Sequence, residues 1–207
     1  MVRRQIAAFA LVSSFAAGQA SALTVDVKEV HTVAANVHAT IQLRDVIPDR
    51  FKKIVDSGGQ LHLRLQAELW ESRPVWDRLV YPAIIRMFRM AHHSPSRDLT
   101  IDDSAGASAS FATLPNPWEV LLDLGGSDRI GSAERYYVHV IATIGTLADR
   151  DADEVNDAVF GRESDDNTLG SFGRMLFRTA MRVGDYLQSV SAETKSRKIT
   201  GADITRP

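Results

Sequence analysis

The stretch LHLRLQAEL, residues 61–69, indicates the fold class because its apolar and polar side chains alternate. Successive side chains of a β-strand point to opposite faces, so this alternation places the leucines on one face. Residues 37–44 (VHATIQLR) alternate in the same way, and residues 136–146 are rich in β-branched and aromatic side chains. These three segments predict strands of a sheet with one face on an apolar core.

Shorter elements are predicted between these strands. An amphipathic helix is expected over residues 48–56, ended by Gly58 and Gly59. A second short helix is expected to begin at Asn116 as its cap and to end at Gly125 and Gly126. Further strands are predicted over residues 75–90, 98–102 and 107–111. Because Pro82 lacks a backbone N–H, the first of these must be bent, bulged or at a sheet edge.

The pattern changes after residue 148. Residues 149–160 predict a short acidic helix, and the apolar residues of 169–190 recur with helical spacing. Residues 191–207 are polar and are expected to form a tail without regular structure. We therefore expect a β-rich domain over 23–148, a C-terminal helical extension over 149–190 packed on it, and the tail. The predicted fold is mainly β with helices (α+β): an antiparallel β-sandwich-like domain with two short inserted helices and a C-terminal helix.

Residues 1–22 have the features of a secretory signal peptide. Arg3 and Arg4 precede the apolar run of residues 6–18, and Ala20-Ser21-Ala22 offers a small-x-small cleavage site. The run is shorter than the roughly 20 apolar residues that span a bilayer. An uncleaved anchor or a buried helix is the alternative. We expect a periplasmic or secreted protein that begins near Leu23 and has no transmembrane segment after signal removal.

Composition and charge exclude several classes of function. The chain has no cysteine, which removes disulfides and thiolate metal sites. Its formal charge of −2 becomes −4 without Arg3 and Arg4. Residues 98–166 hold fifteen Asp and Glu against four Lys and Arg, whereas residues 44–97 and 167–207 each carry +4. An acidic block of this size repels nucleic acid, so we expect no nucleic-acid partner.

Residues 37–148 resemble an uncharacterised exported bacterial domain-of-unknown-function family. The segment ESRPVWD (71–77) is similar to its Arg-x-x-Trp element, SFATL (110–114) to its Ser-Phe-x-Thr-Leu element, and YYVHV (136–140) to its closing strand. The resemblance implies an exported, β-rich accessory domain, sometimes encoded beside envelope sensor kinases. It implies no particular activity.

The candidate binding surface is aromatic and basic, and it comprises Trp70, Arg73, Trp76, Arg78 and Tyr81, with Arg86 and Arg89 following. Arginine beside tryptophan and tyrosine is the composition of interface hot spots. The competing interpretation is a packed corner, in which the tryptophans cover a sheet edge and the arginines pair with Glu68, Glu71 and Asp77.

A second candidate surface is the basic stripe Arg174, Arg178 and Arg182, spaced four residues apart on the predicted C-terminal helix. Such a stripe suits peripheral contact with anionic lipid or an acidic partner. The alternative is a helix face that forms salt bridges with the acidic block.

Metal and catalytic motifs are weak. The acids Asp149, Asp151, Asp153 and Asp157 imitate a calcium loop, but Glu154 replaces its glycine and Phe160 its bidentate glutamate. A helix fits the same residues. His38, His62 and His139 would cluster only if their strands were neighbours, and His92-His93 suits a solvated loop. The chain has neither a Gly-x-Ser-x-Gly elbow nor a phosphate-binding glycine loop.

These observations favour an exported non-enzymatic accessory or interaction domain of the bacterial cell envelope, with a protein partner there and no cofactor. Two alternatives remain: a small periplasmic hydrolase or metal-dependent enzyme, and an envelope lipid- or surface-binding protein. Clustered histidines and acids would favour the enzyme, whereas an exposed aromatic patch would favour a binding role.

Overall fold

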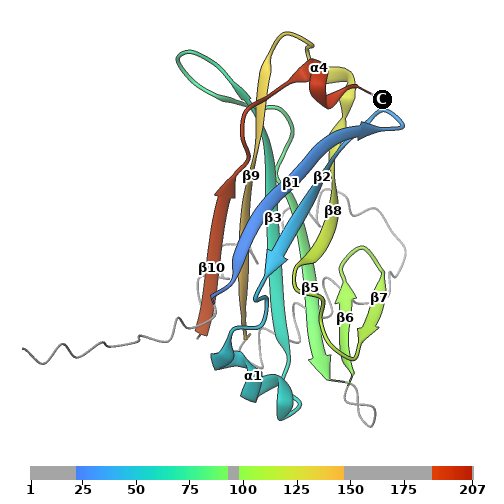
Figure 1. The fold of residues 1–207 in the computed structure, drawn as a ribbon, viewed down its shortest axis with the longest axis vertical. Helices are drawn as coiled ribbons and strands as arrows, with labels where there is room; N and C mark the ends of the chain where they lie inside the picture. The colour runs from blue at the N-terminus through green and yellow to red at the C-terminus, as the bar shows by residue number, and fades with distance from the viewer. Residues whose placement is uncertain (1–21, 93–97, 147–187, 207) are drawn as a thin grey trace, which may run out of the picture.

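The computed structural model describes residues 22–92, 98–146 and 188–206, which form a sandwich of two antiparallel sheets (Figure 1). Sheet A has the order β1 (Thr24–Val33), β2 (Asn36–Arg44), β8 (Trp118–Gly126). Sheet B has the order β10 (Gln188–Lys195), β9 (Arg135–Thr146), β3 (Leu61–Ser72), β5 (Ile84–His92), β6 (Leu99–Asp103), β7 (Ser108–Phe111). Two short strands, β4 (Arg78–Leu79) and β11 (Ile199–Thr200), pair with β3 and β9. The predicted β-rich, sandwich-like fold class is confirmed.

The core lies between the inner faces of the two sheets. The alternating leucines of 61–69 are buried on β3, and Val138, Val140, Ala142 and Ile144 are buried beside them on β9. Sheet A contributes the buried alternate residues of β2 and β8. Each buried leucine or isoleucine stabilises the fold by roughly 1.5–3 kcal/mol relative to an exposed one, so this interface is the main source of stability.

Short helices close both ends of the sandwich. Helix α1 (Asp49–Asp56) lies at one end and buries Phe51 and Val55, as the sequence predicts for residues 48–56. Helix α4 (Gly201–Ile204) lies at the other end, packs against β1 and β11, and buries Ile204 (Figure 1). No helix in the described part of the chain is long and apolar enough to cross a membrane.

The helix predicted to begin at Asn116 is wrong, because this segment forms strand β8. Val120, Leu122 and Leu124 are buried while Glu119 and Asp123 are exposed, so the segment alternates as a strand does. Asn116 does not cap a helix. Its side-chain amide instead donates to the Asp45 carboxylate over 3.0 Å.

The prediction that residues 191–207 form a tail without regular structure is also wrong. Strand β10 pairs with β9 from Gln188 to Lys195, so the predicted helix cannot extend to Val190. After β10, the chain forms β11 and then α4. The predicted helix of 149–160 and the remainder of the helix of 169–190 lie outside the described residues.

Two strands differ from the expected boundaries. Strand β1 is missed because a bulge between Val27 and Glu29 interrupts its alternation. The expected bent strand of 75–90 is two strands, β4 and β5, and Pro82 lies in the break between them.

The side chain of Arg86 joins the two sheets at one edge. It pairs with the buried Asp103 on β6, and its Nη1 donates over 2.8 Å to the Leu121 carbonyl of β8. This bond occupies a carbonyl on the outer edge of sheet A, where an unpaired group would invite another strand.

Candidate functional site

The feature that stands apart from the packed sandwich is the loop of residues 73–77, called here the β3–β4 loop. It connects the end of β3 to the two-residue strand β4, whose residues pair with Trp70 and Glu71. Figure 1 shows the loop extending from the end of the sandwich opposite α1. The hairpin is therefore anchored to the centre of sheet B while its loop is free to meet another surface.

Glu71 fixes the base of this loop. Its side chain is 8% exposed and accepts hydrogen bonds from Arg73, the first loop residue, and Arg78, the first residue of β4. The hydrogen bond from Arg73 lowers the pKa of Glu71 most, burial opposes it, and the bond from Arg78 lowers it further. Because two guanidinium groups share one carboxylate, the cluster keeps a net positive charge. Both arginines remain about half exposed.

Asp77 holds the other side of the loop. Its carboxylate accepts the backbone N–H of Arg73 over 3.1 Å and the hydroxyl of Tyr137, on β9, over 2.8 Å. The Tyr137 hydroxyl and then the Arg73 amide lower the pKa of Asp77. Burial and the bond to Asp77 raise the pKa of Tyr137 to about 12, so its hydroxyl remains a donor at neutral pH. These bonds tie the loop across its own ends and to the sheet.

The loop presents two large apolar side chains to solvent. Trp76 is 80% exposed and Val75 is 75% exposed. Burying a side chain of this kind stabilises a fold by roughly 1.5–3 kcal/mol, and here that contribution is absent. A loop that is held by hydrogen bonds at both ends and still exposes a tryptophan and a valine is typical of a site that binds another surface.

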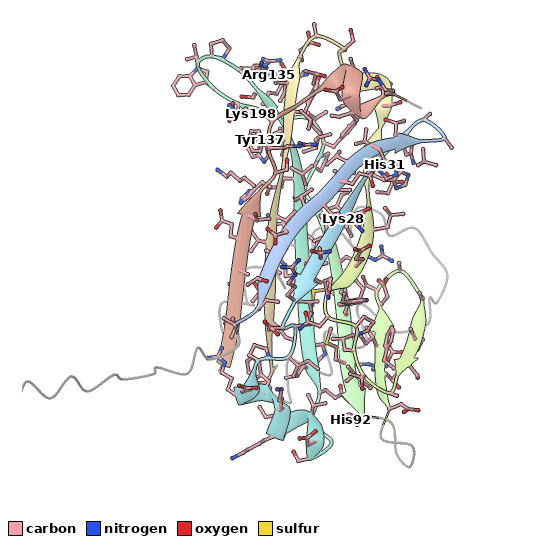
Figure 2. All side chains as sticks on the ribbon, viewed as in Figure 1. Lys28, His31, His92, Arg135, Tyr137 and Lys198 are labelled. Carbon is pink, nitrogen blue, oxygen red and sulfur yellow. The ribbon has the colours of Figure 1, made fainter. Side chains whose placement is uncertain are left out.

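Basic side chains surround the loop. Arg135 stands opposite Ser72 in the β9–β3 register, and Lys195 Nζ lies 5.9 Å from the centre of the Tyr137 ring. Lys198 is close enough to Asp77 for its charge to lower the pKa of that carboxyl. Figure 2 shows Arg135, Lys198 and Tyr137 together at the base of the loop. Arg197 is exposed and follows Ser196, which is hydrogen-bonded to the backbone of Val138 beside Tyr137. We define the basic rim as Arg73, Arg78, Arg135, Lys195, Arg197 and Lys198.

The structure brings together Arg73, Trp76 and Arg78 of the predicted surface but not its other two members. Trp70 is half-buried, and its Nε1 donates to Glu68 over 3.0 Å. The Tyr81 hydroxyl donates to the Gly126 carbonyl, and its ring lies against Gly125, whose φ of +120° suits glycine. Trp70 therefore belongs to the packing of the sandwich and Arg73 and Arg78 pair with Glu71, as the packed-corner interpretation expects, but Trp76 is not packed. Tyr81, which that interpretation does not include, is packed as well.

A second polar cluster lies on the outer face of sheet B around Glu68 and His139. His139 Nδ1 is 3.2 Å from Glu68, and its Nε2 is 2.8 Å from Glu193 on β10. Burial raises the pKa of Glu68, but hydrogen bonds from Gln66, Trp70 and His139 outweigh it and lower that pKa. Since both ring nitrogens of His139 contact carboxylates, neither is available as a base toward a substrate. The cluster joins three strands of the sheet.

The other predicted metal and charge motifs do not form a site in the described residues. His38 lies in sheet A, and His62 lies six residues along β3 from Glu68, which pairs with His139. Within residues 22–92, 98–146 and 188–206, no group of three or more His, Asp or Glu side chains could hold a metal ion. His92 is 3.6 Å from Asp56, and His93 lies outside this part of the chain. So do Asp149, Asp151, Asp153 and Asp157 of the calcium-like motif and Arg174, Arg178 and Arg182 of the basic stripe.

The Glu71 cluster predicts a pH-dependent stability. Because the folded-state pKa of Glu71 is lowered, the unfolded chain takes up this proton first as pH falls, and the stabilisation is lost through the acid range. We expect Glu71→Gln to lower the free energy of unfolding by about 1–2 kcal/mol at neutral pH. The effect is no larger because water around the half-exposed arginines screens part of the ion pairing. Urea unfolding of both proteins measures the difference, which should be constant above about pH 5 and shrink below about pH 4.

If the free energies of unfolding of the two proteins differ by the same amount at every pH, the charge of Glu71 does not stabilise the fold. An Asp49→Asn variant is the matched control. Its carboxylate pairs with Lys52 at the surface of α1, so we expect it to change stability by less than about 0.5 kcal/mol.

Comparison of the chain with protein-family models, curated proteins and solved structures finds no match. The function is therefore argued from the residues of the β3–β4 loop and the basic rim.

Proposed function

We propose that the protein is an exported, non-enzymatic accessory domain of the bacterial cell envelope that contacts its target through the β3–β4 loop. The observation that carries the proposal is the exposure of Trp76, at 80%, beside Val75 on a loop held at both ends. Tryptophan and arginine together are the side chains most enriched at binding hot spots.

Preorganisation supports a binding role. A side chain that is ordered only on binding costs roughly 0.5–1.5 kcal/mol of affinity. The bonds from Asp77 to Arg73 and Tyr137, with the Glu71 ion pairs, already hold the loop before any target is present. Two apolar side chains on a rigid support are ready to bind at little further entropic cost.

The envelope location of this proposal comes from the sequence. Residues 1–22 combine a basic start, an apolar run and a small-x-small site, and the absence of cysteine suits an oxidising compartment. The resemblance of residues 71–77 and 136–140 to an exported accessory family would imply the same location, but no family model matches the chain, so the proposal rests on the features of residues 1–22.

Site-specific crosslinking in cells that export the protein tests the proposal. A photoreactive benzoylphenylalanine replaces Trp76 in one variant and Leu121 in a matched control. Leu121 is 52% exposed on β8 of the other sheet, so it reports on general apolar exposure. We expect light-dependent adducts from position 76 and not from position 121, in a protein whose mass shows that residues 1–22 are removed.

The absence of adducts from position 76, or the same adducts from both positions, would reject the loop as the contact point. A retained N-terminus in the cytoplasmic fraction would reject export. The identity of the adduct, protein or lipid, also separates the two kinds of target.

A further inference from the structure

We infer that the target of the β3–β4 loop is the surface of a bilayer containing anionic phospholipid. This inference rests on the proposed function, because it names the partner of the same site. In the inferred arrangement, Val75 and Trp76 enter the interfacial layer of the bilayer while the basic rim contacts the lipid phosphates.

The apolar part of the site is too small for a typical protein interface. An aromatic side chain buries at most about 250 Å², so Val75 and Trp76 together offer on the order of 300–400 Å². A stable protein interface buries about 800 Å² on each partner, polar and apolar area together, so these two side chains alone would supply at most about half of one. A loop that inserts into a bilayer needs no such area, because the surrounding lipid closes around the inserted side chains.

The shape and chemistry of the loop suit a bilayer. Trp76 is an amphipathic ring, and tryptophan is enriched at the level of lipid headgroups. The loop extends outward from the end of the sandwich (Figure 1), and its Val75 and Trp76 side chains are mostly exposed, so a flat surface that approaches the loop can take them up. Hydrogen bonds from Asp77 keep the two loop ends in place during insertion.

The charge around the loop complements anionic headgroups. The six cations of the basic rim outnumber by one the five acids of the same region, which are Glu68, Glu71, Asp77, Glu134 and Glu193. Glu71 is buried between its two arginines. Asp77 is exposed and keeps its negative charge on the loop, and the nearby charge of Lys198 offsets it. The planar guanidinium groups of Arg73 and Arg78, each about half exposed, keep N–H groups for phosphate oxygens.

Vesicle binding by the purified full chain tests this inference. The lipid is either phosphatidylcholine alone or phosphatidylcholine mixed with phosphatidylglycerol, in each case with a brominated phosphatidylcholine that quenches inserted tryptophan. We expect sedimentation with the mixed vesicles, quenching of tryptophan emission, and weaker binding as salt screens the charges. Trp76→Phe should still sediment but lose most of the quenching, because Trp70 and Trp118 are half-buried in the sandwich.

Matched charge variants separate the basic rim from general electrostatics. Each basic residue near an anionic membrane contributes about fivefold to binding, so Arg197→Gln with Lys198→Gln should weaken binding about tenfold or more. Lys52→Gln with Lys53→Gln, which removes two exposed cations of α1 at the opposite end, should leave binding unchanged. All variants keep residues 147–187, so differences between them report on the exchanged side chains.

Three results would overturn the inference: no binding to mixed vesicles, equal quenching in Trp76→Phe and the unchanged protein, or equal losses in the two charge variants. Should vesicles fail while crosslinking at position 76 yields a protein adduct, the loop is still the contact point and its target is a protein. Should both experiments fail, the proposed function falls with the inference.

Discussion

Replacing Ile204 by alanine is expected to lower the free energy of unfolding by about 3 kcal/mol, the usual cost of a large-to-small change in a core. Ile204 is fully buried in the core although it lies within the last four residues of the chain. It closes the end of the sandwich from α4, which packs against β1 and β11. A cavity at this place removes apolar contacts that no other side chain replaces.

The measurement is urea unfolding followed by tryptophan fluorescence, with Arg206→Ala as the control. Arg206 is exposed and forms only a long ion pair with Asp203, at 3.8 Å, so its loss should lower the free energy of unfolding by less than about 0.5 kcal/mol. Equal stabilities of Ile204→Ala and Arg206→Ala would show that the C-terminal residues do not contribute to the core.

Ile204 also shows where sequence patterns fail. Residues 191–207 are polar on average, and short strands at a sheet edge need only a few apolar side chains. The pairing of β10 with β9 joins residues about 50 positions apart, such as Ala192 and Ala142. No local pattern encodes that partner, whereas the alternation of residues 61–69 is complete within β3.

The prediction for the segment that forms strand β8 fails for a different reason. The apolar side chain of Leu121 lies at an exposed position, so Val120, Leu121 and Leu122 form a continuous apolar run that hides the alternation. Asn116 and Pro117 then imitate a helix start, but the Asn116 side chain is bonded to Asp45 in the loop after β2. The tertiary contact decides the structure here against the local propensity.

The candidate site was predicted in part. Arg73, Trp76 and Arg78 can be found from the sequence because aromatic and basic side chains gather around a proline there. The bond between Asp77 and Tyr137 spans 60 positions, and Lys195 and Lys198 are more distant still. What makes the loop rigid and its surroundings basic therefore depends on the order of strands in sheet B.

Trp76→Ala is expected to have the largest effect on function with almost none on stability. An exposed side chain contributes little to packing, so its removal should change the free energy of unfolding by less than about 0.5 kcal/mol. Removal of a hot-spot tryptophan costs about 2 kcal/mol or more of binding free energy, a loss of about thirtyfold or more. Few other single changes in this protein should separate binding from stability so completely.

Trp70→Ala is the matched control because it removes the same kind of side chain from the neighbouring strand. Trp70 is half-buried, pairs with Tyr137 and Leu79, and donates to Glu68. We expect it to lower the free energy of unfolding by about 2–3 kcal/mol, somewhat less than a fully buried tryptophan.

The most direct test of the β3–β4 loop as the contact point is the fraction of Trp76→Ala retained by the cell envelope, measured on the same preparation as its melting temperature. We predict an unchanged melting temperature and a loss of envelope retention. A lower melting temperature with full retention would contradict this, and would place Trp76 in the packing of the sandwich.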